Sequence, residues 1–179
     1  MDLLDRLLRG ETVEEHDGYY PTAGAVIERA VQVPRPPFVV AADGPRLIDL
    51  AARRADAWNT LGGQPMRGFG TPPVSLEEAV AATARRTALL DAACDRIGRP
   101  RDSIRRTLLA YRVDPELFAS ADAFADYVGR YRDVGVDEFI FYWPVDPGTF
   151  DRVPAHEQAM ERIAGVTIPA MRAASATAG

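Results

Sequence analysis

The chain has 179 residues, of which 47% are hydrophobic and 26% charged, and its formal net charge is −5 at pH 7. This composition is ordinary for a globular domain with a hydrophobic core, and the negative charge disfavours nonspecific binding to nucleic acid. All 21 basic residues are arginines, which excludes a Schiff base to lysine, and Cys94, the single cysteine, excludes an intrachain disulfide.

The first 37 residues are predicted to form a short helix and an extended lead-in. One face of the helix carries four leucines, and Gly10 ends it. Residues 11–20 are predicted to be a loop, residues 23–30 a weak helical turn, and residues 32–37, with three prolines, an extended approach to the next strand. This N-terminus lacks the features of a signal peptide, and no stretch approaches the roughly 20 apolar residues of a membrane span, so we expect a cytoplasmic protein.

Residues 36–60, PPFVVAADGPRLIDLAARRADAWNT, are predicted to form a strand, a tight turn, a helix and a second strand. The continuous apolar run from Phe38 to Ala42 is typical of a parallel strand that is covered on both faces. Asp43-Gly44 marks a turn, and Pro45 suits the first position of a helix. The second strand, residues 55–60, follows a helical crossover, so the two strands are predicted to be parallel.

A glycine- and proline-rich loop then precedes the longest predicted helix. Ser75 and Glu78 form a capping-box pattern at the start of this helix, and Gly98 ends it. A strand is predicted at residues 107–113, followed by a helix over about residues 120–135.

The C-terminal part of the chain continues the alternation. A strand is predicted at residues 138–143, rich in β-branched and aromatic side chains, and a closing helix at residues 154–164. Gly165 and Pro169 are expected to break that helix and to leave residues 166–179 as a frayed tail. Strands that alternate with helices predict an α/β fold with a parallel sheet.

Three stretches of the sequence, in the same order, resemble the luciferase-like monooxygenase superfamily. These are the bacterial-luciferase-type oxidoreductases that use FMN or the deazaflavin coenzyme F-420. The superfamily pattern in the first stretch is an apolar strand, Ala-Ala-x-Gly-Pro, a helix and Ala-Asp-x-Trp. It is matched by Ala41, Ala42, Gly44, Pro45, Ala55, Asp56 and Trp58. The other stretches are LLDAACDRIGRPRDSIRRTLLAYRV, from Leu89, and FADYVGRYRDVGVDEFIFYWP, from Phe124, so the similarity covers nearly the whole chain.

The resemblance also implies a partial barrel. A full (β/α)8 barrel takes about 250 residues, and superfamily members have an N-terminal half before the segment that resembles residues 36–60. The implied fold is α/β, the C-terminal half of a TIM (β/α)8 barrel, with its last four β/α units and parallel strands. We expect a single domain over residues 1–179, with the lead-in at residues 1–37, the four units at residues 38–165 and the tail at residues 166–179.

A half-barrel has unpaired surfaces. Its first and last strands, near Val39 and Phe141, are expected to be free edges, and its barrel-facing side chains to form an exposed apolar patch. We therefore expect either a homodimer or a partner chain that supplies the missing half-barrel. The alternative is that the N-terminal leucine helix folds over the open side.

Ligands of parallel α/β folds bind at the C-terminal ends of the strands, which form one rim of the sheet. The turn after the first strand has the best anion-site chemistry: Gly44 lets the backbone approach a ligand, the N–H groups after Pro45 form a helix N-terminus, and Arg46 adds a charge. The resemblance implies that the phosphate tail of the cofactor contacts the backbone of Ala41, Ala42 and Gly44. The alternative is that Gly44-Pro45 is only a tight turn, and the acidic residue before it disfavours an anion.

Further candidates end the other strands at this rim. Asn59 and Thr60 end the second strand, where Asn59 either binds the cofactor or caps the loop backbone. Arg112 either faces a ligand or pairs with a nearby acid. Tyr142 and Trp143 are expected to be core residues rather than a wall against a flat ring.

The sequence singles out no catalytic residue. The two histidines, His16 and His156, lie far apart without carboxylates at ligand spacing, so we expect no metal site. Cys94 falls on the apolar stripe of a helix, which favours a buried structural thiol over a nucleophile. Arg67 lies in the glycine- and proline-rich loop, where it either swings over a phosphate or is solvated.

Two functions are open at this point. The first is a flavin- or deazaflavin-dependent oxidoreductase, a monooxygenase or hydride transferase, that binds FMN or coenzyme F-420 once the missing half-barrel is supplied. The second is a non-catalytic half-barrel that self-associates and has a binding or structural role. Separate titrations with FMN and the deazaflavin distinguish them, because tight stoichiometric binding by this chain counts against the second.

Overall fold

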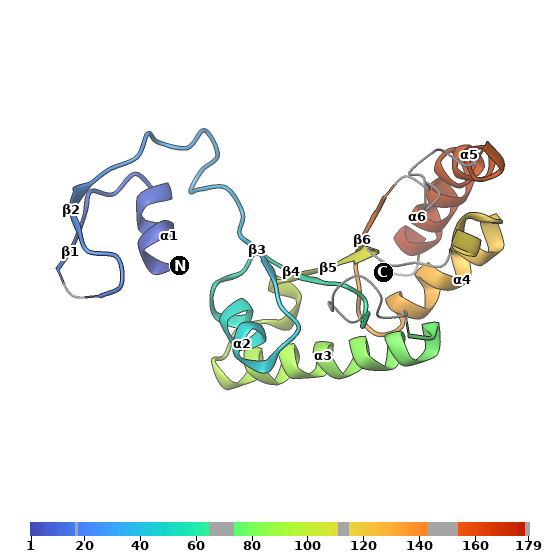
Figure 1. The fold of residues 1–179 in the computed structure, drawn as a ribbon, viewed down its shortest axis with the longest axis horizontal. Helices are drawn as coiled ribbons and strands as arrows, with labels where there is room; N and C mark the ends of the chain where they lie inside the picture. Colours follow the sequence, from blue (N-terminus) through green and yellow to red (C-terminus); the bar gives the residue numbers. More distant parts are fainter. Residues whose placement is uncertain (17, 65–73, 111–114, 143–153, 178–179) are drawn as a thin grey trace.

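The computed structural model describes residues 1–16, 18–64, 74–110, 115–142 and 154–177. Figure 1 shows a central parallel sheet with helices on one side of it and a small N-terminal unit beside its first strand. Within the described residues, no helix is long and apolar enough to cross a membrane.

The N-terminal unit consists of helix α1 (Asp2–Leu8) and an antiparallel pair of short strands, β1 (Val13–Glu15) and β2 (Thr22–Ala25). The helical turn predicted at residues 23–30 was therefore wrong, and the loop predicted at residues 11–20 is interrupted by β1. The strands have only three and four residues, which is too few to show an alternating pattern in the sequence. Val13 is buried, and the Thr22 hydroxyl donates a 3.3 Å hydrogen bond to Val13 O across the pair.

Four parallel strands form the main sheet in the order β3-β4-β5-β6. They are β3 (Val39–Ala41), β4 (Ala57–Thr60), β5 (Arg105–Ala110) and β6 (Glu138–Phe141). The parallel sheet and its free edges at Val39 and Phe141 are confirmed among the described residues. Strand β5 begins two residues earlier than predicted, and residues 111–113 of the predicted strand lie outside the described residues.

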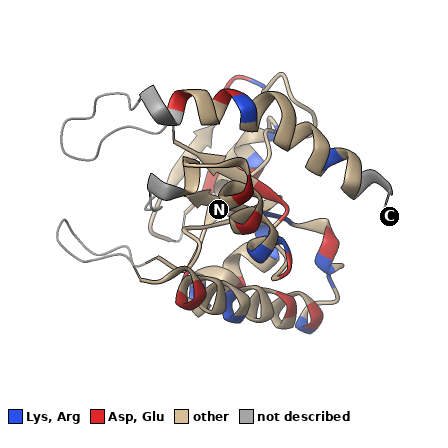
Figure 2. Ribbon diagram, turned by 90° about the vertical axis from the view of Figure 1, so that its right-hand side faces the viewer, with Lys and Arg blue, Asp and Glu red and all other residues tan. Residues whose placement is uncertain are grey.

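Helices α2 (Pro45–Arg54), α3 (Leu76–Arg96) and α4 (Ala121–Arg132) connect these strands. The predicted capping box opens α3, because Glu78 N donates to Ser75 Oγ at 3.2 Å and Ser75 N donates to Glu78 Oε2 at 3.1 Å. Short 3-10 turns lie at Arg101–Ser103 and Pro115–Phe118. Acidic and basic residues are interspersed along α3, the lowest helix in Figure 2.

The C-terminal region differs from its prediction. Helix α5 (Pro154–Arg162) passes through a π-helical segment (Ile163–Thr167) into a further helix, α6 (Ile168–Thr177), so the expected break and frayed tail were wrong. The π segment shifts the backbone hydrogen-bond ladder just before Pro169, which has no N–H to contribute. Ile163 is fully buried, and Ile168 and Met171 pack on the same core cluster, which outweighs the weak helix propensity of Gly165 and Pro169.

The helices cover one face of the sheet. Side chains alternate along each strand, and Val40 and Trp58, which are paired across β3 and β4, pack with Ile48 and Leu90 on the side of α2 and α3. A second cluster joins Leu108 and Ala110 of β5 to α4 and the π segment. The core therefore lies between the sheet and the helices.

The opposite face of the sheet is open at its two edge strands, whereas Ala57, Asn59 and Thr107 on its middle strands are buried. Val39 is 59% exposed and Ile140 is 44% exposed, so the prediction that the run from Phe38 to Ala42 is covered on both faces was wrong. The run is apolar although only one of its faces is packed. The open face is also mixed rather than apolar, because Arg105 and Glu138 form an ion pair on it at 3.3 Å.

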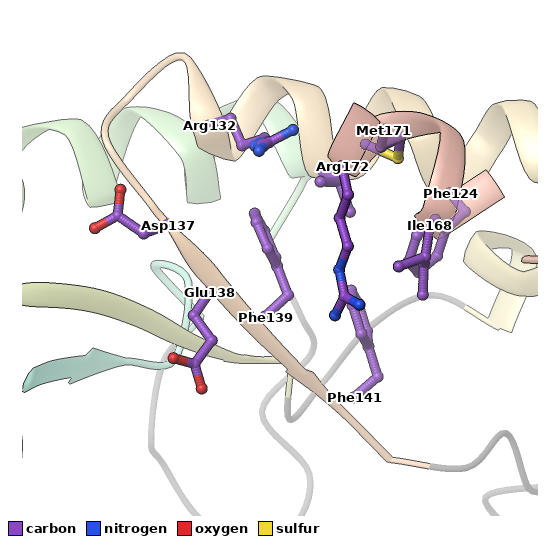
Figure 3. A pocket seen from close by; sticks show the side chains of 10 residues that line it. Phe124, Arg132, Asp137, Glu138, Phe139, Phe141, Ile168, Met171 and Arg172 are labelled. Atoms are coloured by element: carbon purple, nitrogen blue, oxygen red, sulfur yellow. The ribbon is translucent and has the colours of Figure 1, made fainter. Parts of the chain in front are cut away.

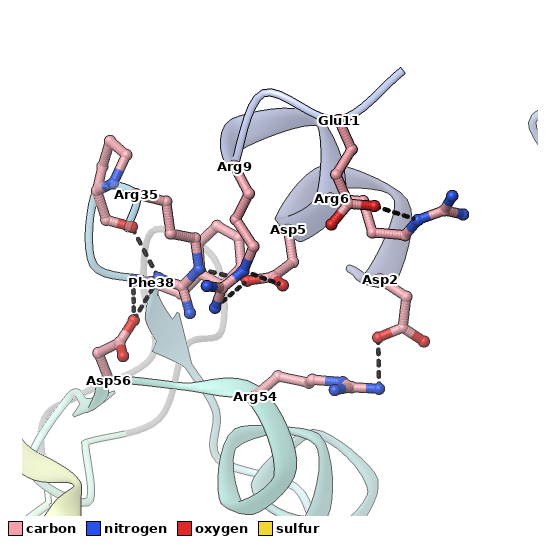
Figure 4. Close-up of polar contacts among 10 residues, drawn as sticks. Asp2, Asp5, Arg6, Arg9, Glu11, Arg35, Phe38, Arg54 and Asp56 are labelled. Carbon is pink, nitrogen blue, oxygen red and sulfur yellow. Dashed lines mark hydrogen bonds and ion pairs between the residues drawn. The ribbon is translucent and has the colours of Figure 1, made fainter. Parts of the chain in front are cut away.

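Helix α1 does not cover this open face. It lies beside β3 in Figure 1, apart from β4, β5 and β6, and none of its residues is buried. Ion pairs join its Asp2 to Arg54 and its Asp5 to Arg35, at the ends where β3 and β4 begin (Figure 4). The leucine helix is thus held near the N-terminal ends of the strands.

Candidate functional site

The candidate site is the rim formed by the C-terminal ends of β3 and β4. Strand β3 runs through Ala42 and Asp43 into α2, with Gly44 as the N-cap and Pro45 at the first helical position, as predicted. Leu47 N and Ile48 N both donate to Gly44 O, at 3.1 and 3.0 Å. In the described part of the chain, the backbone N–H of Arg46 is therefore the donor of the first turn that makes no hydrogen bond. The start of α2 thus offers fewer free N–H groups to a ligand than the sequence suggested.

Gly44 leaves room beside the backbone. Its φ of −98° suits any residue, and a Cβ built on it meets no atom of a described residue within 4 Å. Internal packing therefore does not require glycine here, whereas close approach of a ligand to the backbone would. The side chain of Arg46 is exposed next to this space and forms no ion pair with another described residue.

An ion pair offsets the acidic charge at the rim. Asp43 Oδ1 lies 3.4 Å from Arg86 Nη1 of α3 and accepts a 3.2 Å hydrogen bond from the Thr60 hydroxyl. Arg86 Nη1 is buried and makes no hydrogen bond within the described residues. The charge of Arg86 therefore offsets the charge of Asp43, which alone would repel an anion, and among the described residues its buried Nη1 lacks the hydrogen bond that a buried nitrogen normally makes.

A buried tryptophan fixes the backbone of this rim. Trp58 Nε1 donates to Ala42 O at 2.7 Å, and Ala42 N donates to Asn59 O at 3.1 Å. Both backbone polar groups of Ala42 are thus engaged within the chain. The Thr60 hydroxyl also donates within the chain, to Asp43, so Ala42 and Thr60 hold the rim in place. Ala41, Gly44 and Arg46 are exposed at the rim.

A buried polar pair lies next to the rim, on the face of the sheet opposite to the helices. Asn59 Nδ2 donates to Thr107 Oγ1 at 2.7 Å, and Thr107 Oγ1 in turn donates to Trp58 O at 3.3 Å. Asn59 is in register with Ala41 on one side and Thr107 on the other, so the three share the face opposite to the helices. Asn59 Oδ1 has no hydrogen-bond partner among the described residues and can accept one from a ligand.

Sequence reasoning missed Arg86 and Thr107 and the anchoring of the loop after β4. Tyr131 OH donates to Gly62 O at 2.7 Å, and a Cβ on Gly63 would lie 2.1 Å from Ala79 O. Desolvation raises the pKa of Tyr131 to about 12. The Gly62-Gly63 pair was the available signal, since adjacent glycines between a strand and a helix often mark a close backbone approach.

The other sequence candidates have mixed outcomes. Tyr142 is 57% exposed, so its expected place in the core was wrong, and Cys94 is buried as predicted, with desolvation raising the pKa of its thiol. Three more candidates, Arg67, Arg112 and Trp143, lie outside the described residues, as does the side chain of His156.

A separate hollow of about 220 Å³ lies between β6, α4 and α6 (Figure 3). Its apolar walls include Phe124, Phe139, Phe141 and Ile168, and its charged residues include Arg172. Phe139 and Phe141 belong to the helix-side core cluster, so this hollow is on the other side of the sheet from Asn59 and Thr107. It is not part of the candidate site.

Comparisons with known proteins agree with this architecture. The family model described as luciferase-like monooxygenase matches residues 1–112. A search of curated proteins found no match. Among solved structures, the coenzyme F420-dependent tetrahydromethanopterin reductase from Methanopyrus kandleri aligns with a TM-score of 0.66 at 15% identity, covering 94% of this chain and 60% of that one.

A second solved structure, an F420-dependent secondary alcohol dehydrogenase in complex with an F420-acetone adduct, aligns with a TM-score of 0.57 at 11% identity. It covers 78% of this chain and 53% of that one. The chain thus spans 53–60% of the length of these neighbours and has the fold of consecutive β/α units of a TIM barrel. Because the matched residues 1–112 make up more than half of its length, the chain belongs to the luciferase-like monooxygenase family.

Proposed function

We propose that this chain contributes part of the cofactor site of a flavin- or deazaflavin-dependent oxidoreductase that performs hydride transfer or monooxygenation. Its family supplies the cofactor class, FMN or coenzyme F-420. The observation that carries the placement is the buried Arg86 Nη1, which has no hydrogen bond within the described residues and lies beside the turn at Asp43. A phosphate-bearing tail supplies the acceptor that this nitrogen lacks.

The residues at the rim suit such a tail. Gly44 opens onto free space, Arg46 offers an unbonded N–H and an exposed guanidinium, and Arg86 neutralises Asp43. The bound flavin or deazaflavin ring would supply the redox chemistry. This chain would hold the anionic tail at the rim, beside the buried pair of Asn59 and Thr107, where Asn59 Oδ1 can accept a hydrogen bond.

The experiment is a binding titration of FMN and coenzyme F-420 separately, followed by quenching of cofactor fluorescence. The variant is Arg86→Gln, and the matched control is Arg85→Gln, which removes an exposed arginine from the neighbouring position of α3. We expect the dissociation constant of the bound cofactor to rise roughly tenfold or more in Arg86→Gln and to stay within about twofold in Arg85→Gln. Equal behaviour of the two variants would reject the assignment of Arg86.

We further propose that a second copy of the chain, or a partner chain, supplies the missing strands. The free edges of β3 and β6, the open face and the 53–60% coverage of the neighbours support this. Sedimentation velocity at micromolar concentration is the test, with a dimer or larger assembly expected. A stable monomer that still binds cofactor tightly would contradict it.

The open face also favours a second candidate function, a non-catalytic half-barrel that associates with itself. Val39 and Ile140 are exposed at the two edge strands of this face. An assembly that forms normally but binds neither FMN nor coenzyme F-420 would support this alternative over the oxidoreductase.

A further inference from the structure

Arginines from several segments converge at the end of the sheet opposite to the rim. They surround a hollow of about 190 Å³ where β3 and β4 begin, which we call the arginine bowl. Its lining consists of Asp5, Arg9, Arg35, Arg53, Arg54, Ala55, Asp56 and Arg99. These residues come from α1, the lead-in, the end of α2, the start of β4 and the segment after α3 (Figure 4 shows most of them).

The bowl carries a net positive charge in a chain whose formal net charge is −5. Five arginines and two aspartates line it. Their partners outside the hollow are Asp2, which pairs with Arg54, and Asp49, which pairs with both Arg53 and Arg96. Counting these partners, six arginines face four aspartates, so the local excess is two positive charges.

Arg99 contributes much of this excess. Its guanidinium donates to Ala52 O at 2.9 Å and Ala55 O at 2.8 Å, and its Nε donates to Ser103 Oγ at 2.9 Å. Within the described residues none of these partners is a carboxylate. Arg99 is therefore held in place by neutral groups and forms no ion pair with another described residue, although its charge is near enough to Asp56 to help lower the pKa of that carboxyl.

The two carboxylates of the bowl are already committed. Asp5 accepts from Arg9 at 2.8 Å and from Arg35, and Asp56 accepts from Arg35 and from Phe38 N, both at 2.6 Å. Arg35 is 10% exposed, whereas Arg9, Arg53 and Arg54 are 40–51% exposed. An entering anion would thus meet the exposed guanidinium groups of Arg9, at the end of α1, and of Arg53 and Arg54 in α2.

We propose that the arginine bowl binds a phosphate-type oxyanion, either inorganic phosphate or the terminal phosphate of a small ester. Guanidinium groups match the geometry of phosphate oxygens, and several of them around one hollow can share two or three negative charges. Because α1 buries none of its residues and is joined to this end of the sheet by ion pairs, a bound anion would also link α1 to α2. This site lies at the other end of the strands from the rim and does not depend on the proposed cofactor.

The test is calorimetric titration of the full chain with inorganic phosphate and, separately, with glycerol phosphate, at constant ionic strength set with sodium chloride. The variants are Arg53→Gln and the double variant Arg53→Gln/Arg54→Gln. The control is Arg130→Gln on α4, because Arg130 pairs with Asp126 four residues away just as Arg53 pairs with Asp49, and both arginines are 51% exposed. Far-UV circular dichroism establishes that each variant is folded.

We expect saturable binding that the double variant weakens roughly tenfold or more, while Arg130→Gln changes it less than about twofold. Tighter binding of glycerol phosphate than of inorganic phosphate would assign the site to esters, and the reverse order would assign it to the free ion. Absence of saturable binding of both, or equal weakening in the double variant and the control, would overturn the proposal.

Discussion

Replacing Trp58 by phenylalanine tests how β4 fixes the turn that leads into α2. Trp58 is fully buried, and its indole nitrogen donates a 2.7 Å hydrogen bond to the carbonyl oxygen of Ala42. Phenylalanine keeps an aromatic ring in the cluster with Ile48 and Leu90 but removes the donor. The Ala42 carbonyl then loses this partner in a place where water has little access.

The expected loss follows from two contributions. A buried acceptor left without its partner costs about 1–3 kcal/mol. The smaller phenylalanine ring lowers the stabilisation from packing by about 1 kcal/mol, because the surrounding side chains close only in part around it. We therefore expect the free energy of unfolding of Trp58→Phe to be about 2–4 kcal/mol lower than that of the wild type.

The assay is urea unfolding followed by far-UV circular dichroism. Tyr20→Phe is the control, because Tyr20 is 75% exposed and loss of its hydroxyl should change the free energy of unfolding by less than about 0.5 kcal/mol. If Trp58→Phe were as stable as this control, the indole bond would not hold the turn, and the account of a prearranged rim would fail.

Three further predictions concern packing and titration. Gly63→Ala should lower the free energy of unfolding by about 2 kcal/mol or more, because its Cβ would lie 2.1 Å from Ala79 O at a φ of +79°. Gly129→Ala, in the middle of α4, should instead raise the free energy of unfolding by about 1 kcal/mol, and denaturant unfolding measures both changes. Desolvation raises the pKa of Asp56, but hydrogen bonds from a guanidinium and a backbone N–H outweigh it, so the folded pKa lies below 3.8. The ionised Asp56 carboxylate thus contributes its full stabilisation at pH values above its pKa in the unfolded chain, and this stabilisation is lost as the pH falls through its lower pKa in the folded chain. Asp56→Asn should therefore reduce the fall of the urea midpoint below about pH 4. The pKa of Tyr131 is raised to about 12 mainly by desolvation, so in an ultraviolet titration Tyr131→Phe should reduce the late tyrosinate step. If Tyr131→Phe instead reduced the absorbance change near the ordinary value of 10, its burial would be contradicted.

Local chemistry made much of the fold predictable. Ser75 and Glu78 announce the start of α3, and Asp43-Gly44-Pro45 marks the turn from β3 into α2. These signals act within four residues, so the sequence alone displays them. The two-stranded N-terminal unit and α6 were missed because each depends on packing between distant segments, such as the burial of Ile163 against the second core cluster, which outweighs Pro169.

The candidate site was predicted only in outline. Gly44 and Asn59 became candidates because they lie at the ends of predicted strands, where the ends of parallel strands meet at one rim. Arg86 was not among these candidates, since nothing in the spacing of α3 shows which of its three arginines approaches Asp43. Thr107 was missed for a related reason, because its partnership with Asn59 arises from strand register across a separation of 48 residues.

The alternation along β4 has a practical consequence for protein engineering. Trp58 belongs to the packed layer and Asn59 to the open one, so a single inserted or deleted residue would exchange their roles and place an amide where an indole now packs. Mutational libraries that aim to change the chemistry of the face opposite to the helices should therefore vary every second codon of each strand. Ala41, Asn59 and Thr107 form one row for such a library, and the codons between them should be left unchanged.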